Sequence, residues 1–236
     1  MSERAARVWA WIAATHQGDP PVSIKALCRA AVQRLGVDGA SVTALDGLGA
    51  RELVCASDRL SARLEELQLT QGEGPAVARF RFGSPELIPD LESAAARWPG
   101  FAPAAMKAGA RAMFSFPLQT GAIAAGVFSL YRVRPGLLAA AELADGLVFA
   151  DIALRLLLDD SAGISGSPGY RPVDGLWEAR AEVHQATGMV SVQLGVSLDE
   201  AFVRLRAHAF ARDVALGEIA SDVVGRRLRF DPDPAP

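Results

Sequence analysis

The amino-acid sequence predicts an α+β protein in two parts, an antiparallel sheet with helices packed on one side, followed by a bundle of three helices. Apolar residues in the first part switch repeatedly between the spacing of helices and the alternation of strands. Residues 159–172 are rich in Gly, Ser and Pro and lack apolar periodicity, which is typical of a linker. Beyond this segment the apolar spacing is helical throughout.

The first part is predicted to open with a helix at 23–35, which ends at Gly36. Two strands at 40–45 and 52–56 follow, joined by a turn. Ser57 is a plausible N-cap for a short helix. Further elements are expected at 76–80, 86–90, 110–118, 122–131 and 137–158.

The last of these elements, 137–158, is a long helix with more apolar surface than one sheet face needs. The additional apolar surface indicates that another helix packs against this one. That partner is either the N-terminal helix around Val8, Trp9 and Ile12 or a second subunit.

The second part is predicted to be three helices. Val183, Ala186 and Val190 belong to a heptad-like stripe, and Gly195 ends the first helix. Ser197 to Glu200 is a capping box that starts the second helix, and Asp213 can cap the third. Residues expected inside are Ala201, Phe202, Leu205, Ala209, Leu216, Ile219, Ala220, Val223 and Val224. Many are small, so the helices pack closely and the function must lie on the surface of the bundle.

The composition limits the classes of protein that fit the chain. Half of the 236 residues are hydrophobic and 22% are charged, which is typical of a globular protein with a sizeable core. The net charge is −3, so any nucleic-acid binding must come from a local patch. No apolar run of about 18 residues and no signal-peptide pattern occurs. We therefore expect a cytoplasmic protein that does not cross a membrane.

No set of residues predicts catalysis, a metal site or a cofactor. The histidines lack partners at ligand spacing, and no phosphate loop or nucleophile elbow is present. Cys28 and Cys55 are interpreted as buried thiols in a reducing cytosol. The glycine-rich stretch 71–75 is interpreted as a tight turn before a helix. Residues 97–101 form either a lid over a small ligand, with Trp98 as its apolar part, or a surface loop held by its aromatic residues.

Charge alone does not settle what the second part binds. Residues 176–230 contain seven basic and seven acidic side chains. Arg204, Arg206 and Arg212, with His208, crowd the second helix. Arginine suits phosphate contacts and base stacking, but on charge alone a solvated helix face is the favoured interpretation.

The stretch from Glu182 onward resembles the ANTAR family. The matching residues are Gln185-Ala186, Gly188-Met189, Gly195 to Ser197, Asp199 to Phe202, Leu205-Arg206, Ala209 and Leu216 to Ala220. The resemblance implies a three-helix domain that binds paired hairpin loops in nascent RNA, usually as a dimer, and prevents transcription termination. The chain has Thr187 where the family commonly has lysine, and lost cations weaken RNA affinity. Expected RNA contacts are Gln185, Thr187, Gly188, Arg204, Arg206, His208 and Arg212.

Residues 20–158 resemble the GAF domains that precede ANTAR domains in actinobacterial regulators. The likeness rests on 71–75, 88–91, 97–99 and 110–118. The resemblance implies a sensory domain that binds a small molecule or dimerises, and it does not identify an effector. A ligand pocket is expected at Trp98, Phe101, Phe114 and Phe116.

Together these observations predict a homodimeric, signal-responsive RNA-binding antiterminator that is not an enzyme. The expected parts are an N-terminal helix (1–19), a GAF-like domain (20–158), a linker (159–172), an ANTAR-like domain (173–230) and a tail (231–236). The alternative is a protein-interaction or dimerisation module whose ANTAR-like bundle no longer binds RNA. The neutral charge and Thr187 favour the alternative, and the retained spacing and arginines oppose it.

Overall fold

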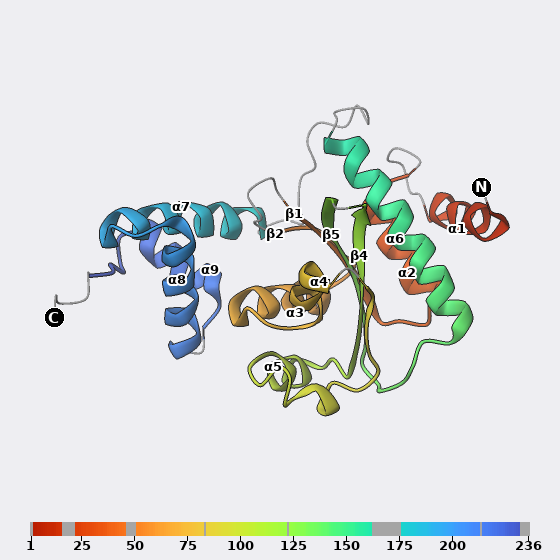
Figure 1. The fold of residues 1–236 in the computed structure, drawn as a ribbon, viewed down its shortest axis with the longest axis horizontal. Helices are drawn as coiled ribbons and strands as arrows, with labels where there is room; N and C mark the ends of the chain where they lie inside the picture. Colours follow the sequence, from red (N-terminus) through yellow and green to blue (C-terminus); the bar gives the residue numbers. More distant parts are fainter. Residues whose placement is uncertain are drawn as a thin grey trace. The chain divides into compact units, whose positions relative to one another are not determined.

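The computed structural model describes residues 2–15, 22–45, 51–82, 84–121, 123–161, 176–212 and 214–231. The chain forms two compact units. The first holds a sheet with flanking helices, and the second holds three helices together with the short segment Leu69–Gly72 (Figure 1). None of the described helices is both long and apolar enough to span a bilayer.

Five antiparallel strands form the sheet of the first unit, which confirms the predicted sheet. They are β1 (Gly39–Leu45), β2 (Arg51–Ala56), β3 (Glu86–Ile88), β4 (Ala112–Thr120) and β5 (Ile123–Arg132). Their order is β2-β1-β5-β4-β3, so β1 pairs with the last strand of the chain as well as with β2. Both faces of the central strands are buried, because apolar and small residues occupy successive positions.

Helices cover both faces of this sheet (Figure 1). On one face lie α1 (Glu3–Ala14), α2 (Ile24–Arg34) and α6 (Ala140–Ser161), and on the other lie α3 (Arg59–Gln71), α4 (Pro75–Phe82) and α5 (Phe101–Ala108). The prediction of helices on one side only was therefore wrong. Phe114 of β4 packs on the α2 and α6 side, whereas its neighbour Met113 packs on the α5 side, so each face needs its own cover.

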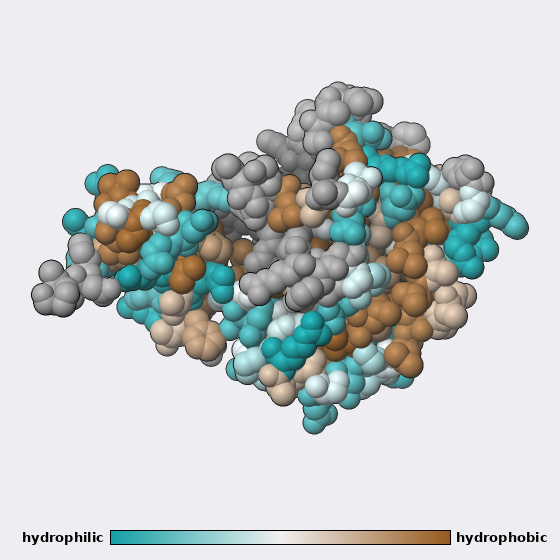
Figure 2. Space-filling model, in the orientation of Figure 1, coloured by the Kyte–Doolittle hydropathy of each residue, from teal (hydrophilic) through white to brown (hydrophobic). Residues whose placement is uncertain are grey.

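The core beneath α6 is built from aromatic rings. Phe128 lies between Phe116 and Phe149, with ring centroids 6.1 Å and 6.3 Å apart. Val8 and Ile12 of α1 are fully buried in the same core. The N-terminal helix α1 therefore packs against α6, as one of the two predictions had it, and α2 packs against α6 as well. Hydrophobic residues still gather on the surface over α6 (Figure 2).

The cap of α3 differs from the prediction. The carboxylate of Asp58 accepts a hydrogen bond from the backbone N–H of Ser61 at 2.9 Å, so Asp58 caps the helix. The hydroxyl of Ser57 instead accepts the N–H of Ala40 at 2.9 Å and ties β1 to the start of α3.

Cys28 of α2 and Cys55 of β2 are buried in the same core, as predicted. A hydrogen bond with the Cys55 thiol, together with burial, raises the pKa of Cys28 well above its ordinary value. The same hydrogen bond lowers the pKa of Cys55. Because both thiols are buried away from the reagent, neither should react with an aromatic disulfide reagent in the folded protein. Absorbance should report both thiols only after unfolding. Rapid release of one equivalent from the native protein would contradict this packing.

The second unit contains α7 (Leu176–Leu194), α8 (Leu198–Arg212) and α9 (Leu216–Val224), which confirms the predicted bundle. Its core is made of the small and branched residues Val183, Ala186, Val190, Ala201, Leu205, Ala209, Leu216, Ile219, Ala220 and Val223. Ser197 accepts the N–H of Glu200 at 3.2 Å, but the Glu200 carboxylate pairs with Arg204. Only half of the predicted capping box therefore forms. The proposed cap Asp213, the helix start near Val173 and most of the predicted linker lie outside the described residues.

Candidate functional site

The surface of α8 carries most of the candidate RNA-binding cations. Acidic residues are confined to its first turn, and residues 201–212 contain three arginines, one histidine and no acid. The apolar spacing turns Leu205 and its buried neighbours inward, which places the intervening side chains outside. A locally cationic ridge therefore exists on a unit whose total charge is balanced.

The three arginines of this ridge are held differently. Arg204 Nε lies 3.0 Å from the Glu200 carboxylate, one turn earlier on the helix. The guanidinium of Arg206 lies over the ring of Phe202, 5.8 Å from its centroid. Arg212 is exposed in the last turn, where a cation also complements the helix dipole. Nε and Nη2 of Arg206 also donate to the backbone carbonyls of Thr70 and Gln71 at 3.4 Å and 3.2 Å, and burial lowers the pKa of Arg206. Arg204 and Arg212 therefore present N–H groups to a phosphate more readily than Arg206.

His208 belongs to the packing of the bundle. Its ring lies 5.1 Å from that of Phe230, and its Nε2 atom is buried without a hydrogen-bond partner among the described residues. Burial, with the nearby charge of Arg212, lowers the pKa of His208, so the neutral ring dominates at pH 7. The geometry therefore does not favour the predicted role of His208 as an RNA contact.

The three residues of α7 that were predicted to contact RNA differ in their exposure. Gln185 is exposed and Gly188 is half-exposed, so both lie on the surface. Thr187 is only 9% exposed, and its hydroxyl donates to the carbonyl of Val183 at 2.7 Å. A buried, satisfied hydroxyl offers nothing to a ligand, so the prediction of a Thr187 contact is corrected.

The four residues predicted to line a pocket in the first unit do not come together. Trp98 and Phe101 pack on the α5 side of the sheet, whereas Phe114 and Phe116 pack on the α6 side. The Trp98 ring is buried edge-on against Phe101, with centroids 6.4 Å apart. Arg97 covers the same ring at 4.5 Å. Residues 97–101 are therefore a loop held by its aromatic residues, and Trp98 is not an open lid.

The glycine-rich turn at 71–75 has a structural role, as predicted. Gly74 adopts φ +124°, a left-handed conformation that favours glycine. The Glu73 carboxylate accepts the N–H groups of Gly100 and Phe101 at 2.6 Å and 2.7 Å. The turn thus fixes the N-terminus of α5, where a negative charge is also favourable.

The sequence-based reasoning missed a buried polar row on the α3 side of the sheet. Ser41, Thr43, Ser115 and Ser129 are all buried there. The buried carboxylate of Glu65 accepts hydrogen bonds from Ser41 at 2.9 Å and from Thr43 at 3.3 Å. Ser and Thr at alternate positions of β1 were the available signal. The row gives this unit an internal polar site beside a helix.

A small cavity of about 250 Å³ lies on the other face, between β4 and α6. Phe116, Leu147 and Leu154 contribute to its lining. Among the predicted pocket residues, Phe116 alone lines it. No group of three or more His, Cys, Asp or Glu side chains suited to a metal ion occurs in the described part of the chain.

Both units are similar to known domains. The model of the ANTAR domain family matches residues 177–224. The GAF domain of a phosphoenolpyruvate-protein phosphotransferase from Coxiella burnetii is 16% identical, with a TM-score of 0.53, and the match covers 70% of this chain and 99% of that one. A domain of a two-component sensor histidine kinase protein from Sinorhizobium meliloti 1021 is 22% identical, with a TM-score of 0.51, covering 61% and 94%. At these identities the likeness shows the fold. No curated protein matches the chain.

Proposed function

Since the chain joins a domain of the GAF fold to an ANTAR domain, we propose that it is a signal-responsive RNA-binding antiterminator. The observation that carries the proposal is the cationic ridge of α8, which lies within the residues that match the ANTAR family. ANTAR domains bind paired hairpin loops in nascent transcripts. Arg204, Arg206 and Arg212 are the proposed phosphate contacts, and Gln185 and Gly188 of α7 are proposed as further contacts.

Local charge is sufficient for this role. Arginine presents several N–H donors in a planar fork that matches two phosphate oxygens. Every phosphate that is neutralised releases counterions, so the affinity should fall steeply as salt rises. The net charge of −3 adds no attraction of its own. RNA affinity should therefore depend on a few arginines far more than on total charge.

We propose that the sensory unit acts by changing the geometry of a homodimer. An effector or partner that binds one arrangement more tightly shifts the population toward it. In that arrangement the two ANTAR domains would hold paired hairpins at once. One feature supports an effector or partner: the apolar surface over α6, where Leu147 and Leu158 are exposed. The identity of the effector is not part of the proposal.

Transcription in a purified system tests this function. The template carries two hairpins that overlap an intrinsic terminator, and the control template carries the same terminator with scrambled loops. We expect the purified protein to raise readthrough on the first template alone. Equal readthrough on both templates, or none on either with the dimer intact, would overturn the proposal.

Gly188 gives a prediction that separates stability from binding. A Cβ at Gly188 would meet no described atom within 4 Å, so the bundle itself does not require glycine there. Gly188→Ala should stabilise the second unit by about 0.5–1 kcal/mol, because alanine is the better helix former. If the RNA approaches the backbone at this point, the same substitution weakens hairpin binding. Urea denaturation and a hairpin titration measure the two effects.

Gly195→Ala is the matched control, since Gly195 has φ +65° and alanine is strained there. It should destabilise the unit. If Gly188→Ala raises the stability and leaves the affinity for hairpin RNA unchanged, Gly188 is not part of the RNA interface.

The alternative function, a dimerisation module without RNA binding, has one observation in its favour. The second unit exposes the apolar side chains of Val192, Leu198, Val203 and Phe210. Exposed apolar residues can mark a protein interface. Sedimentation of arginine variants, described below, distinguishes this alternative from RNA binding.

A further inference from the structure

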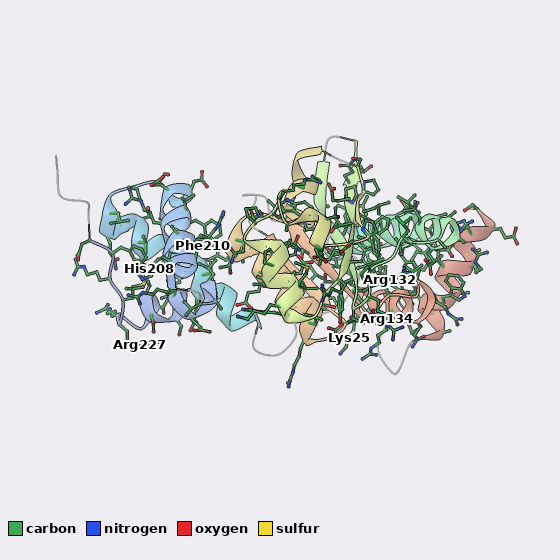
Figure 3. The ribbon with its side chains drawn as sticks, turned by 90° about the horizontal axis from the view of Figure 1, so that it is seen from below. Lys25, Arg132, Arg134, His208, Phe210 and Arg227 are labelled. Atoms are coloured by element: carbon green, nitrogen blue, oxygen red, sulfur yellow. The ribbon has the colours of Figure 1, made fainter. Side chains whose placement is uncertain are left out.

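Two large apolar side chains stand on the outer face of α8. Phe210 is 60% exposed and Val203 is 52% exposed. They are two helical turns apart on one face, with the exposed Ala207 between them. His208 and Phe210, labelled in Figure 3, leave the helix in different directions. His208 joins the packing around Phe230, and Phe210 does not.

The fold does not explain why Phe210 is aromatic. From this helix the core of the bundle takes Ala201, Leu205 and Ala209, with Phe202 packed against them, and Phe210 is not part of it. An exposed phenyl ring keeps its apolar surface in water. The apolar face of the ring is therefore available to a molecule outside the chain.

The charges around Phe210 indicate what that molecule is. Arg206 precedes Phe210 by one turn on the same face, and residues 201–212 contain no acid. Among the described residues of α8, the acids are Asp199 and Glu200 in the first turn, and Glu200 pairs with Arg204. A ligand that presents a flat apolar face beside negative charge fits this pattern. An unpaired nucleotide has both features, in its base and its phosphate.

We propose that Phe210 is a stacking platform for an unpaired base of an RNA hairpin loop. Val203 extends the apolar contact along the helix, and Arg206 meets the phosphate beside the stacked base. This inference rests on the proposed RNA-binding function and deepens it, because it names the part of the RNA that α8 reads. Stacking accepts any base, so this contact selects for unpaired loops over duplex and does not select one sequence.

The test is a titration of the full-length protein with a paired-hairpin RNA that carries 2-aminopurine in its loops. Phe210→Ala should weaken binding roughly 5- to 150-fold, the range for one base stacked on an aromatic ring. Phe210→Leu keeps apolar area without the ring and should show a similar loss. Phe210→Trp should bind within about twofold of the wild type, because indole also stacks. The change in 2-aminopurine fluorescence on binding should vanish for Phe210→Ala and Phe210→Leu.

Leu137→Ala is the matched control, because Leu137 is 72% exposed and lies in the first unit, outside the proposed RNA interface. It should bind like the wild type. If the wild type binds hairpins and Phe210→Ala binds equally well, the stacking inference is overturned and the RNA-binding function stands. If the wild type shows no preference for hairpins, the proposed function itself fails. If Phe210→Ala alters sedimentation and leaves affinity unchanged, a second copy of the chain occupies this face, which also overturns the inference.

Discussion

Replacing Arg204 and Arg206 together by glutamate is expected to reduce the affinity for paired hairpin RNA by at least about a hundredfold at physiological salt. A hydrogen bond to a charged group contributes about 1.5–3 kcal/mol, so the loss of two such contacts gives about that factor. Two new carboxylates beside phosphates add repulsion. Both side chains are outside the core, so circular dichroism should show an unchanged fold.

The matched control for this double variant is Lys107→Glu with Arg134→Glu. Both residues are exposed in the first unit, and the substitutions give the same change in net charge. The control should retain nearly all affinity. Equal losses in the two variants would show that total charge governs binding. Retained affinity in the α8 variant, or altered sedimentation of it without RNA, would favour the dimerisation alternative.

The second large effect concerns the stability of the second unit. Leu205 is fully buried at the centre of its core. Leu205→Ala should cost about 2–5 kcal/mol, because it removes apolar contacts and leaves a cavity among helices that already meet through alanines. A bundle of this size has little stability in reserve, so we expect it to unfold partly or wholly. Hydrogen exchange of the amides of α7, α8 and α9 should accelerate.

Val203→Ala provides the comparison on the same helix. Val203 is mostly exposed, so its truncation should change stability by no more than about 0.5 kcal/mol. Amides of the sheet in the first unit should exchange as in the wild type in both variants. Equal exchange of the amides of α7, α8 and α9 in Leu205→Ala and Val203→Ala would contradict the assignment of Leu205 to the core.

Helices and strands could be predicted from the sequence where the spacing of apolar residues and the capping residues determine them. The apolar spacing and the Ser23 cap define α2, and the Ser and Thr alternation defines β1. The heptad-like stripe identifies the inner face of α7, and that face includes Thr187, one turn after Val183. The burial of Thr187 was therefore readable from the sequence. Likewise, Phe114 and Phe116 share a face because they alternate along one strand.

Other features depend on contacts distant in sequence. The alternation of side chains along β4 does not predict on which face of the sheet Trp98 and Phe101 pack. Their position depends on the path of the loop before α5. The contact of His208 with Phe230 arises from the chain after α9, which has no periodic pattern. The Glu65 site needs β1 and α3 to meet, so only the folded unit reveals it. The fold could therefore be predicted from the sequence to a greater extent than the candidate sites, which depend on contacts between distant residues.

Titration with RNA is the direct test of hairpin recognition. After sedimentation has measured its oligomeric state, the protein is titrated with a tandem-hairpin RNA and with a scrambled RNA of equal length, at several salt concentrations. We expect a clear preference for the hairpins at every salt concentration, with an affinity that falls as salt rises. Equal binding of the two RNAs, or no binding by a dimeric sample, would contradict the proposed function.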